Sequence, residues 1–265
     1  MSQPLLIATN LSKTFTVYKR LGFFKREKKV VTAITDFSLT IEKPMIIGVV
    51  GPNGAGKTTF IKHCLGLVEK SNGTLEVLGY DPYKRKPDFL KQVGLISGQK
   101  QNLDPNLSAL ESLRLSGYLY DMKTVQINER IDYLVDLFNI REKLEVPVRQ
   151  LSLGQRMKFE IISSVLHSPT FLFMDEPSLG LDFESQANMR KLLLDLHQND
   201  GITILLTSHY LPDITELCSR IAVIEGGQKV FDGSLAELKE KSDQDGYLKT
   251  LIQELNKQDK IGEVA

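Results

Sequence analysis

The chain has 265 residues, of which 42% are hydrophobic and 25% are charged. This composition excludes a disordered chain and supplies enough apolar residues for a sizeable core. The 33 basic residues balance the 33 acidic ones, and a net charge of zero argues against a protein that coats nucleic acid, so no nucleic-acid partner is expected.

No membrane-spanning or targeting segment is predicted. The purest apolar run, Met45–Val50, is far shorter than the roughly 20 residues that a membrane-spanning helix needs. The N-terminus lacks a basic region followed by a long apolar stretch, so it does not predict a signal peptide. We therefore expect a cytoplasmic protein that reaches a membrane only through a separate partner chain.

The first part of the chain predicts strands. Leu5–Thr9 and Val30–Ile41 are rich in β-branched and apolar residues with partial alternation. Between them, Lys19–Lys29 holds six basic residues and one acidic residue, which indicates a loop or hairpin insertion. Ile46–Val50 is a continuous apolar run, typical of a strand buried on both faces. The spacing in Phe60–Val68 predicts a helix.

Helices and further strands follow. Helical periodicity is found in Ala109–Tyr120, Val125–Phe138, Gln155–His167 and Glu184–Gln198. Strand patterns are found in Phe171–Met174, Ile202–Leu206 and Ile221–Ile224. This alternation predicts an α/β fold with a parallel sheet, into which a helical block at about residues 105–167 is inserted. The charged segment 239–265 predicts a helical tail.

The most specific motif is Gly51–Thr58, which satisfies the phosphate-loop pattern G-x-x-x-x-G-K-[ST]. Its glycines allow backbone N–H groups to turn inward around a polyphosphate, and the following helix adds the positive end of its dipole. Lys57 is expected to reach the β- and γ-phosphates, and the Thr58 hydroxyl to bind Mg²⁺. The predicted nucleotide-binding residues of this loop are Gly51, Asn53, Gly54, Ala55, Gly56, Lys57, Thr58 and Thr59.

Two carboxylates follow the apolar run Phe171–Met174. They are Asp175 and Glu176, and they would lie at the carboxyl end of a buried strand, where open α/β sheets bind ligands. We expect Asp175 to hold Mg²⁺ through water and Glu176 to activate the attacking water as a general base.

Many nucleotide hydrolases share these two motifs, and the segment Leu151–Gln155, LSLGQ, is more specific. It resembles the LSGGQ signature of the ATP-binding-cassette (ABC) ATPases, with Leu153 in place of the first glycine, and Gln155 lies 20 residues before Asp175. Ser152 and Gly154 would begin a helix at Gln155, and the N-terminus of that helix offers N–H donors to an anion.

Further residues are found in the order that is typical of this family. Gln99 matches the glutamine of the Q-loop, with Gln101 as the alternative, although the preceding residues depart from the commoner spacing. Gly180-Leu181-Asp182 is similar to the D-loop. His209, after the strand Ile202–Leu206, resembles the H-loop histidine that contacts the γ-phosphate.

The residue that stacks on adenine is less sharply defined by the sequence. The family places an aromatic residue after an N-terminal Leu-Ser-Lys segment, which makes Phe15 the candidate and Tyr18 the alternative.

The resemblance covers residues 5–238, and what it implies can be stated as expectations. The fold would be a P-loop NTPase with a RecA-like core, an antiparallel β subdomain and an inserted helical subdomain that contains the signature. ATP and Mg²⁺ would be bound. The implied catalytic residues are Glu176 and His209, the implied metal-binding residues are Thr58, Gln99 and Asp175, and the implied ATP contacts outside the phosphate loop are Phe15, Ser152, Gly154, Gln155 and Asp182.

A single phosphate loop and a single signature form half of the machinery of this family. The resemblance implies a second copy, paired head to tail, so that Lys57 of one copy and Ser152 of the other face the same ATP. It also implies a separate integral membrane permease that holds the ATPase at the inner face of the cell membrane. The segments 98–101 and 153–158 resemble the sodium, drug and polysaccharide exporter branch. An importer ATPase is the alternative, and a soluble ABC protein of translation or DNA repair is a third possibility.

Overall fold

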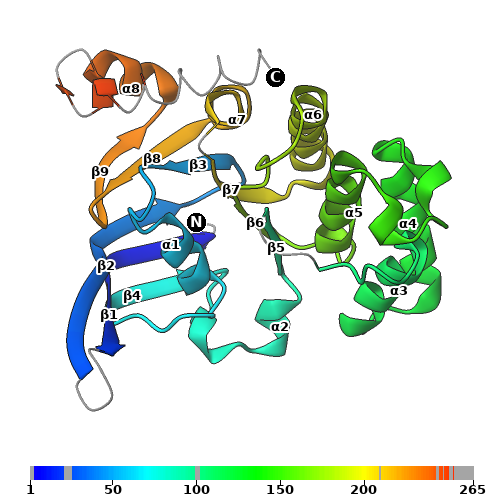
Figure 1. Cartoon of the computed structure of the whole chain (residues 1–265), viewed down its shortest axis with the longest axis horizontal. Helices are drawn as coiled ribbons and strands as arrows, with labels where there is room; N and C mark the ends of the chain where they lie inside the picture. The colour runs from blue at the N-terminus through cyan, green and yellow to red at the C-terminus, as the bar shows by residue number, and fades with distance from the viewer. Residues whose placement is uncertain are drawn as a thin grey trace.

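The computed structural model describes residues 3–20, 26–98, 102–208, 210–242, 245–246, 248–250 and 253, with the side chains of residues 18–20 and 26 excepted. Among these residues, the larger sheet has the strand order β5-β6-β7-β3-β8-β9 (Figure 1). Its strands are parallel except for the antiparallel pair β8 and β9. They are β3 (Ile46–Val50), β5 (Val93–Ser97), β6 (Phe171–Asp175), β7 (Thr203–Thr207), β8 (Arg220–Glu225) and β9 (Gln228–Gly233).

A second, antiparallel sheet has the order β2-β1-β4. Its strands are β1 (Leu6–Arg20), β2 (Arg26–Ile41) and β4 (Asn72–Val77). Lys19 pairs with Glu27, so the basic insertion belongs to a long hairpin. Both strands are longer than the predicted Leu5–Thr9 and Val30–Ile41. The predictions were too short because pairing continues through polar residues, and a register shift after Ala8 interrupts the alternation.

Helices of very different length connect these strands. The α-helices are α1 (Lys57–Cys64), α2 (Pro87–Leu90), α3 (Ala109–Leu119), α4 (Thr124–Leu137), α5 (Leu153–Val165), α6 (Phe183–Asp200), α7 (Leu211–Leu217) and α8 (Leu235–Ser242). Three 3₁₀ turns are η1 (Pro82–Lys84), η2 (Arg141–Lys143) and η3 (Val148–Gln150). In the described part of the chain, none of the helices has the length and apolar character required to cross a bilayer.

The predicted helix at Phe60–Val68 is displaced in the structure. α1 begins three residues earlier, at Lys57, because Gly56 adopts a left-handed conformation with φ 110° and the helix follows at once. It ends at Cys64, shortly before Gly66, which has φ 65°. The elements β4, β5, β9, α2 and α7 have no counterpart among the predicted elements.

The larger sheet is buried on both faces, as the apolar run of β3 predicted. Ile46 and Val50 belong to a hydrophobic cluster shared with the helices α3 to α6. Ile47 and Val49 point to the opposite face and join a cluster with α1 and the antiparallel sheet. Figure 1 shows these layers on opposite sides of the central strands. The helices α3, α4 and α5 lie within the segment 105–167 that was expected to be helical.

An aromatic stack joins the end of α3 to the segment after α5. Tyr120 and His167 lie parallel, with ring centroids 3.7 Å apart. His167 Nε2 donates to the backbone carbonyl of Val93 on β5 at 3.1 Å. Burial lowers the pKa of His167 to about 4, so the folded protein holds the neutral ring at physiological pH.

This depressed pKa predicts a loss of stability in mild acid. The unfolded chain binds a proton at His167 near its ordinary pKa of 6.5, whereas the folded chain binds it only near 4. This contribution to stability is therefore complete well above pH 6.5 and falls as the pH decreases, by about 2 kcal/mol at pH 5. The His167→Gln variant keeps a donor for Val93 but does not titrate. We expect urea unfolding to show that the free energy of unfolding decreases more between neutral pH and pH 5 in wild type than in the variant. Equal decreases in the two proteins would contradict the assignment.

Candidate active site

The phosphate loop joins the end of β3 to the start of α1. Gly56 lies against the hairpin, because a Cβ at this position would come within 2.4 Å of the carbonyl oxygen of Ala33 on β2. Together with its φ of 110°, this contact makes glycine necessary here. The loop lines a cavity of about 330 Å³. The lining residues are Ala33, Asn53, Gly54, Gly56, Lys57, Thr58, Thr59, Glu176 and Leu179.

Lys57 is buried at the edge of this cavity. Its Nζ donates to the carbonyl oxygens of Gly51 at 2.8 Å and Pro52 at 3.2 Å, so the loop itself fixes the ammonium group. Burial lowers the pKa of Lys57, while the nearby carboxylates of Glu176 and Asp175 oppose that effect. The sequence-predicted cation and the two sequence-predicted acids therefore come together.

Asp175 ends β6 and receives two hydroxyl groups on one oxygen. Thr58 Oγ1 donates to Asp175 Oδ1 at 3.0 Å, and Thr207 Oγ1 donates to the same atom at 2.8 Å. Hydroxyl and carboxylate oxygens are ligands that suit Mg²⁺, which is usually held by one or two protein groups together with water and phosphate oxygens. The pair Thr58 and Asp175 thus fits the ion that the family implies.

Glu176 lines the cavity from an unusual backbone conformation. Its φ is 53°, which costs of the order of 1–3 kcal/mol for a residue other than glycine. The N–H of Glu176 donates to the carbonyl oxygen of Thr207 at 3.1 Å and to its Oγ1 at 3.2 Å. These bonds to β7 hold the turn that directs the carboxylate toward the phosphate loop.

The segment before the predicted Q-loop glutamine leaves β5 close to these acids. The N–H of Gly98 donates to the carbonyl oxygen of Asp175 at 3.0 Å, and a Cβ at Gly98 would come within 2.2 Å of the carbonyl oxygen of Glu176. Gly98, where the sequence departs from the commoner Q-loop spacing, is therefore a position where only glycine fits. The predicted Gln99 and its alternative Gln101 lie outside the described residues.

Glu160 of α5 binds the backbone of the residues that follow the predicted Q-loop glutamine. Its carboxylate accepts the N–H of Asn102 at 3.1 Å and that of Leu103 at 3.4 Å. Glu160 is 5% exposed, and burial raises its pKa. Sequence reasoning missed this residue, although an acid on the apolar face of a predicted helix was a usable signal.

The signature begins α5. Ser152 is the N-cap, because its Oγ accepts the N–H of Gln155 at 3.2 Å while Gln155 Oε1 accepts the N–H of Ser152 at 3.1 Å. A Cβ at Gly154 would meet Ser185 Oγ at 2.3 Å, so glycine allows α5 and α6 to approach closely at their N-termini. None of the three signature residues lines the phosphate-loop cavity of the same chain.

Asp182, from the predicted D-loop, is the N-cap of the neighbouring helix α6. Its carboxylate accepts the N–H and the Oγ of Ser185, each at 2.8 Å, and these bonds lower the pKa of Asp182. The signature and the D-loop therefore lie side by side at two helix N-termini.

The predicted adenine and H-loop contacts are only partly visible. Phe15 is half-buried on β1 opposite Val31, and Lys13 Nζ lies 4.9 Å from its ring centroid. Phe15 does not line the phosphate-loop cavity, and the side chain of its alternative Tyr18 lies outside the described residues. His209 also lies outside them.

Comparison with known proteins is consistent with this site. The sequence model described as "ABC transporter" matches residues 34–179. The chain is 35% identical to the ABC transporter ATP-binding protein NatA of Bacillus subtilis over 82% of this chain and 88% of that protein. It is 34% identical to the Nod factor export ATP-binding protein I of Cupriavidus metallidurans over 77% of this chain and 67% of that protein.

A solved structure shows the same fold. A dimeric ATP-binding cassette, in a post-hydrolysis state with ADP and phosphate, matches with a TM-score of 0.73 and 21% identity over 87% of this chain and 98% of that chain. The predicted P-loop NTPase fold, with its antiparallel and parallel sheets, is confirmed. Since the family model covers more than half of the sequence, and a relative matches most of both chains, the chain belongs to the ABC transporter family as an ATP-binding subunit that hydrolyses ATP.

Proposed function

We propose that the chain powers an exporter whose membrane half is a separate permease, and that it works as a head-to-tail pair at the inner face of the cell membrane. The observation that carries the pairing is the position of the signature, whose Ser152 is exposed and does not line the phosphate-loop cavity. A second copy would bring its Ser152 to that cavity. Export is supported by the relative named for Nod factor export.

Hydrolysis would use the residues that surround the cavity. Lys57 and the backbone N–H groups of the loop bind the phosphates, and Glu176 accepts the proton of the attacking water. Thr58 and Asp175, with Gln99 from the Q-loop, hold Mg²⁺, which neutralises charge on the phosphates when it is bound. His209 contacts the γ-phosphate, and Phe15 stacks on adenine.

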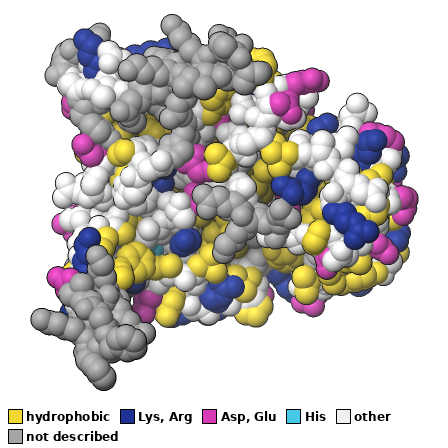
Figure 2. Space-filling model, viewed as in Figure 1, with side chains coloured by type: hydrophobic (Ala, Val, Ile, Leu, Met, Phe, Trp, Pro, Cys, Tyr) yellow, Lys and Arg dark blue, Asp and Glu magenta, His cyan; other side chains and the backbone are white. Residues whose placement is uncertain are grey.

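A groove between α2 and the end of α3 is the proposed permease site. It has a volume of about 390 Å³, and its apolar residues include Leu67, Leu90 and Leu119. Arg85, Lys91 and Asp121 line it as well, and Lys91 pairs with Asp121 at 2.8 Å. Figure 2 shows hydrophobic and basic side chains mixed along the lower part of this face, where α2 and α3 lie. The apolar lining suits the apolar face of a short amphipathic helix.

The general base can be tested by Glu176→Gln. The amide cannot accept a proton, so hydrolysis should fall by about 10²–10⁴-fold while ATP binding is kept. The variant should then accumulate as an ATP-bound dimer in size-exclusion chromatography with Mg-ATP. Glu184→Gln removes an exposed acid on α6 outside the cavity and should behave as wild type. A Glu176→Gln variant that stays monomeric at saturating ATP would contradict the pairing.

The composite site can be tested by mixing two inactive variants. Lys57→Ala removes the phosphate cation, and Ser152→Asp keeps an N-cap oxygen but repels the γ-phosphate. Each alone should be inactive. Random pairing makes half of the dimers mixed, each with one intact site, so the mixture should recover about a quarter of the wild-type rate. If proven mixed dimers recover no hydrolysis, Ser152 does not act across the dimer.

The permease groove can be tested by Leu119→Glu. Leu119 is 76% exposed, so a charge there should not disturb the fold but should oppose an apolar partner. We expect less of the ATPase to sediment with permease-containing membranes, at unchanged activity of the isolated subunit. Val125→Glu is the matched control, because Val125 is 66% exposed on α4 and lies outside the groove. Equal loss in both variants would refute the groove as the docking site.

A further inference from the structure

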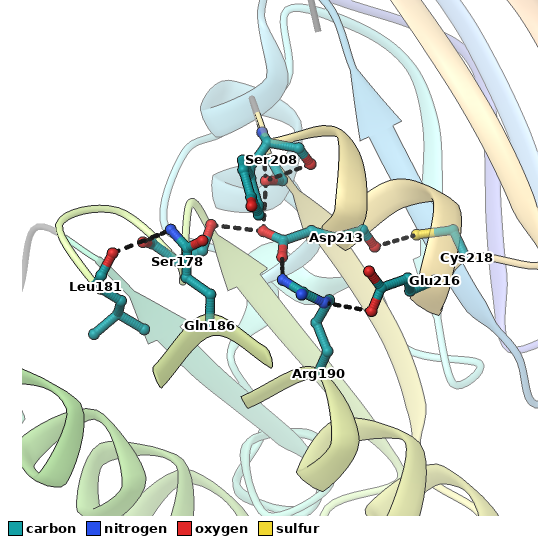
Figure 3. Close-up of polar contacts among 9 residues, drawn as sticks. Ser178, Leu181, Gln186, Arg190, Ser208, Asp213, Glu216 and Cys218 are labelled. Carbon is teal, nitrogen blue, oxygen red and sulfur yellow. Dashed lines mark hydrogen bonds and ion pairs between the residues drawn. The ribbon is translucent and has the colours of Figure 1, made fainter. Parts of the chain in front are cut away.

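A fully buried carboxylate connects two loops that reach the active site. Asp213, on α7, is 0% exposed. Its Oδ2 accepts Ser178 Oγ at 2.6 Å and Ser208 Oγ at 2.7 Å, and Figure 3 shows the two serines converging on it from different loops. Ser178 lies two residues after Glu176. Ser208 directly follows β7 and precedes His209 in the sequence.

The other side of this carboxylate faces a buried arginine. Arg190 of α6 is 3% exposed, and its Nη1 lies 3.3 Å from Asp213 Oδ1. Its Nε donates to Glu216 Oε2 at 2.7 Å. Burial raises the pKa of Asp213, whereas the two serine hydroxyls and Arg190 oppose that rise. A buried ion pair of this kind contributes little net stability, so the value of Asp213 to the protein lies in the hydrogen bonds that it accepts.

The loop that contains Ser178 is held at a second point. Gln186 Nε2 donates to the carbonyl oxygens of Ser178 at 3.3 Å and Leu181 at 3.2 Å (Figure 3). The segment from Glu176 to Asp182 therefore has side-chain contacts along its length. In addition to the bonds between Glu176 and Thr207, Asp213 connects this loop to Ser208, the residue that follows β7.

We propose that Asp213 is a positioning residue for ATP hydrolysis. By accepting both serine hydroxyls on one oxygen, it fixes the loop that contains Glu176 and Asp182 relative to Ser208, which directly precedes His209 in the sequence. The general base Glu176 then keeps its position relative to the carboxyl end of β7. This inference rests on the proposed roles of Glu176 and His209, but Asp213 itself touches neither substrate nor the reacting atoms.

The two serines allow a test that leaves the buried charges in place. Ser178→Ala and Ser208→Ala each remove one hydroxyl and should each lower kcat by about 10- to 100-fold, since small misplacements of reacting groups cost this much. The affinity for ATP should not change. Because both serines act through one carboxylate, the double variant should be no slower than the slower single variant. Ser178→Thr keeps the hydroxyl and should retain the wild-type kcat.

The controls separate positioning from stability and from the proposed chemistry. Glu216→Gln removes the exposed partner of Arg190 and leaves Asp213 with its serines, so kcat should stay at the wild-type value. Serine variants with wild-type kcat, or effects that multiply in the double variant, would overturn the proposal. Failure of the catalytic assignment would instead be seen as hydrolysis that survives Glu176→Gln.

Discussion

One carboxylate oxygen joins the elements on which the site depends. β7 separates β6 from β3 in the sheet, so Asp175 at the end of β6 is not a neighbour of the phosphate loop that follows β3. Its Oδ1 nevertheless receives Thr58 from α1 and Thr207 from β7. The three elements therefore meet at the carboxyl edge of the sheet through side chains, where the backbone ladder has ended. The cation Lys57 and the base Glu176 are placed by this junction.

Close backbone contacts set the positions of the loops around that junction. Gly56 approaches Ala33 of the hairpin, and Gly98 approaches Glu176 at the end of β6. A side chain at either position would push two layers apart, because the nearest atoms belong to backbone. The antiparallel sheet, the phosphate loop and the start of the Q-loop are thus fitted to one another at the level of the main chain. This explains why glycines outside the phosphate-loop pattern matter for the site.

The sequence predicts the local features of this arrangement and misses the long-range ones. The phosphate loop, the two acids after β6 and the Ser152 cap were predictable because each depends on a few adjacent residues and one strand or helix boundary. The hairpin strands were predicted too short, since their pairing depends on cross-strand partners and not on apolar alternation. The apolar face of the predicted helix could mark Glu160 but not its partners, which lie 57 and 58 residues away. Asp213 had no local pattern, and its partner Ser178 lies 35 residues away.

The two buried acids, Glu160 and Asp213, both provide hydrogen-bond acceptors for loops that leave the sheet. Loops that leave the carboxyl ends of strands lose the regular ladder, and their polar groups need other partners. Next to the sheet, Thr207 supplies two acceptor oxygens for the N–H of Glu176. Farther out, the acceptors come from helices: Asp213 of α7 receives serine hydroxyls, and Glu160 of α5 receives the N–H groups that follow the Q-loop. Burial raises the pKa of both acids, so each is held against a desolvation cost by its contacts. Glu160 lies on α5, the same helix whose N-cap is Ser152 of the signature, so one helix contacts both segments.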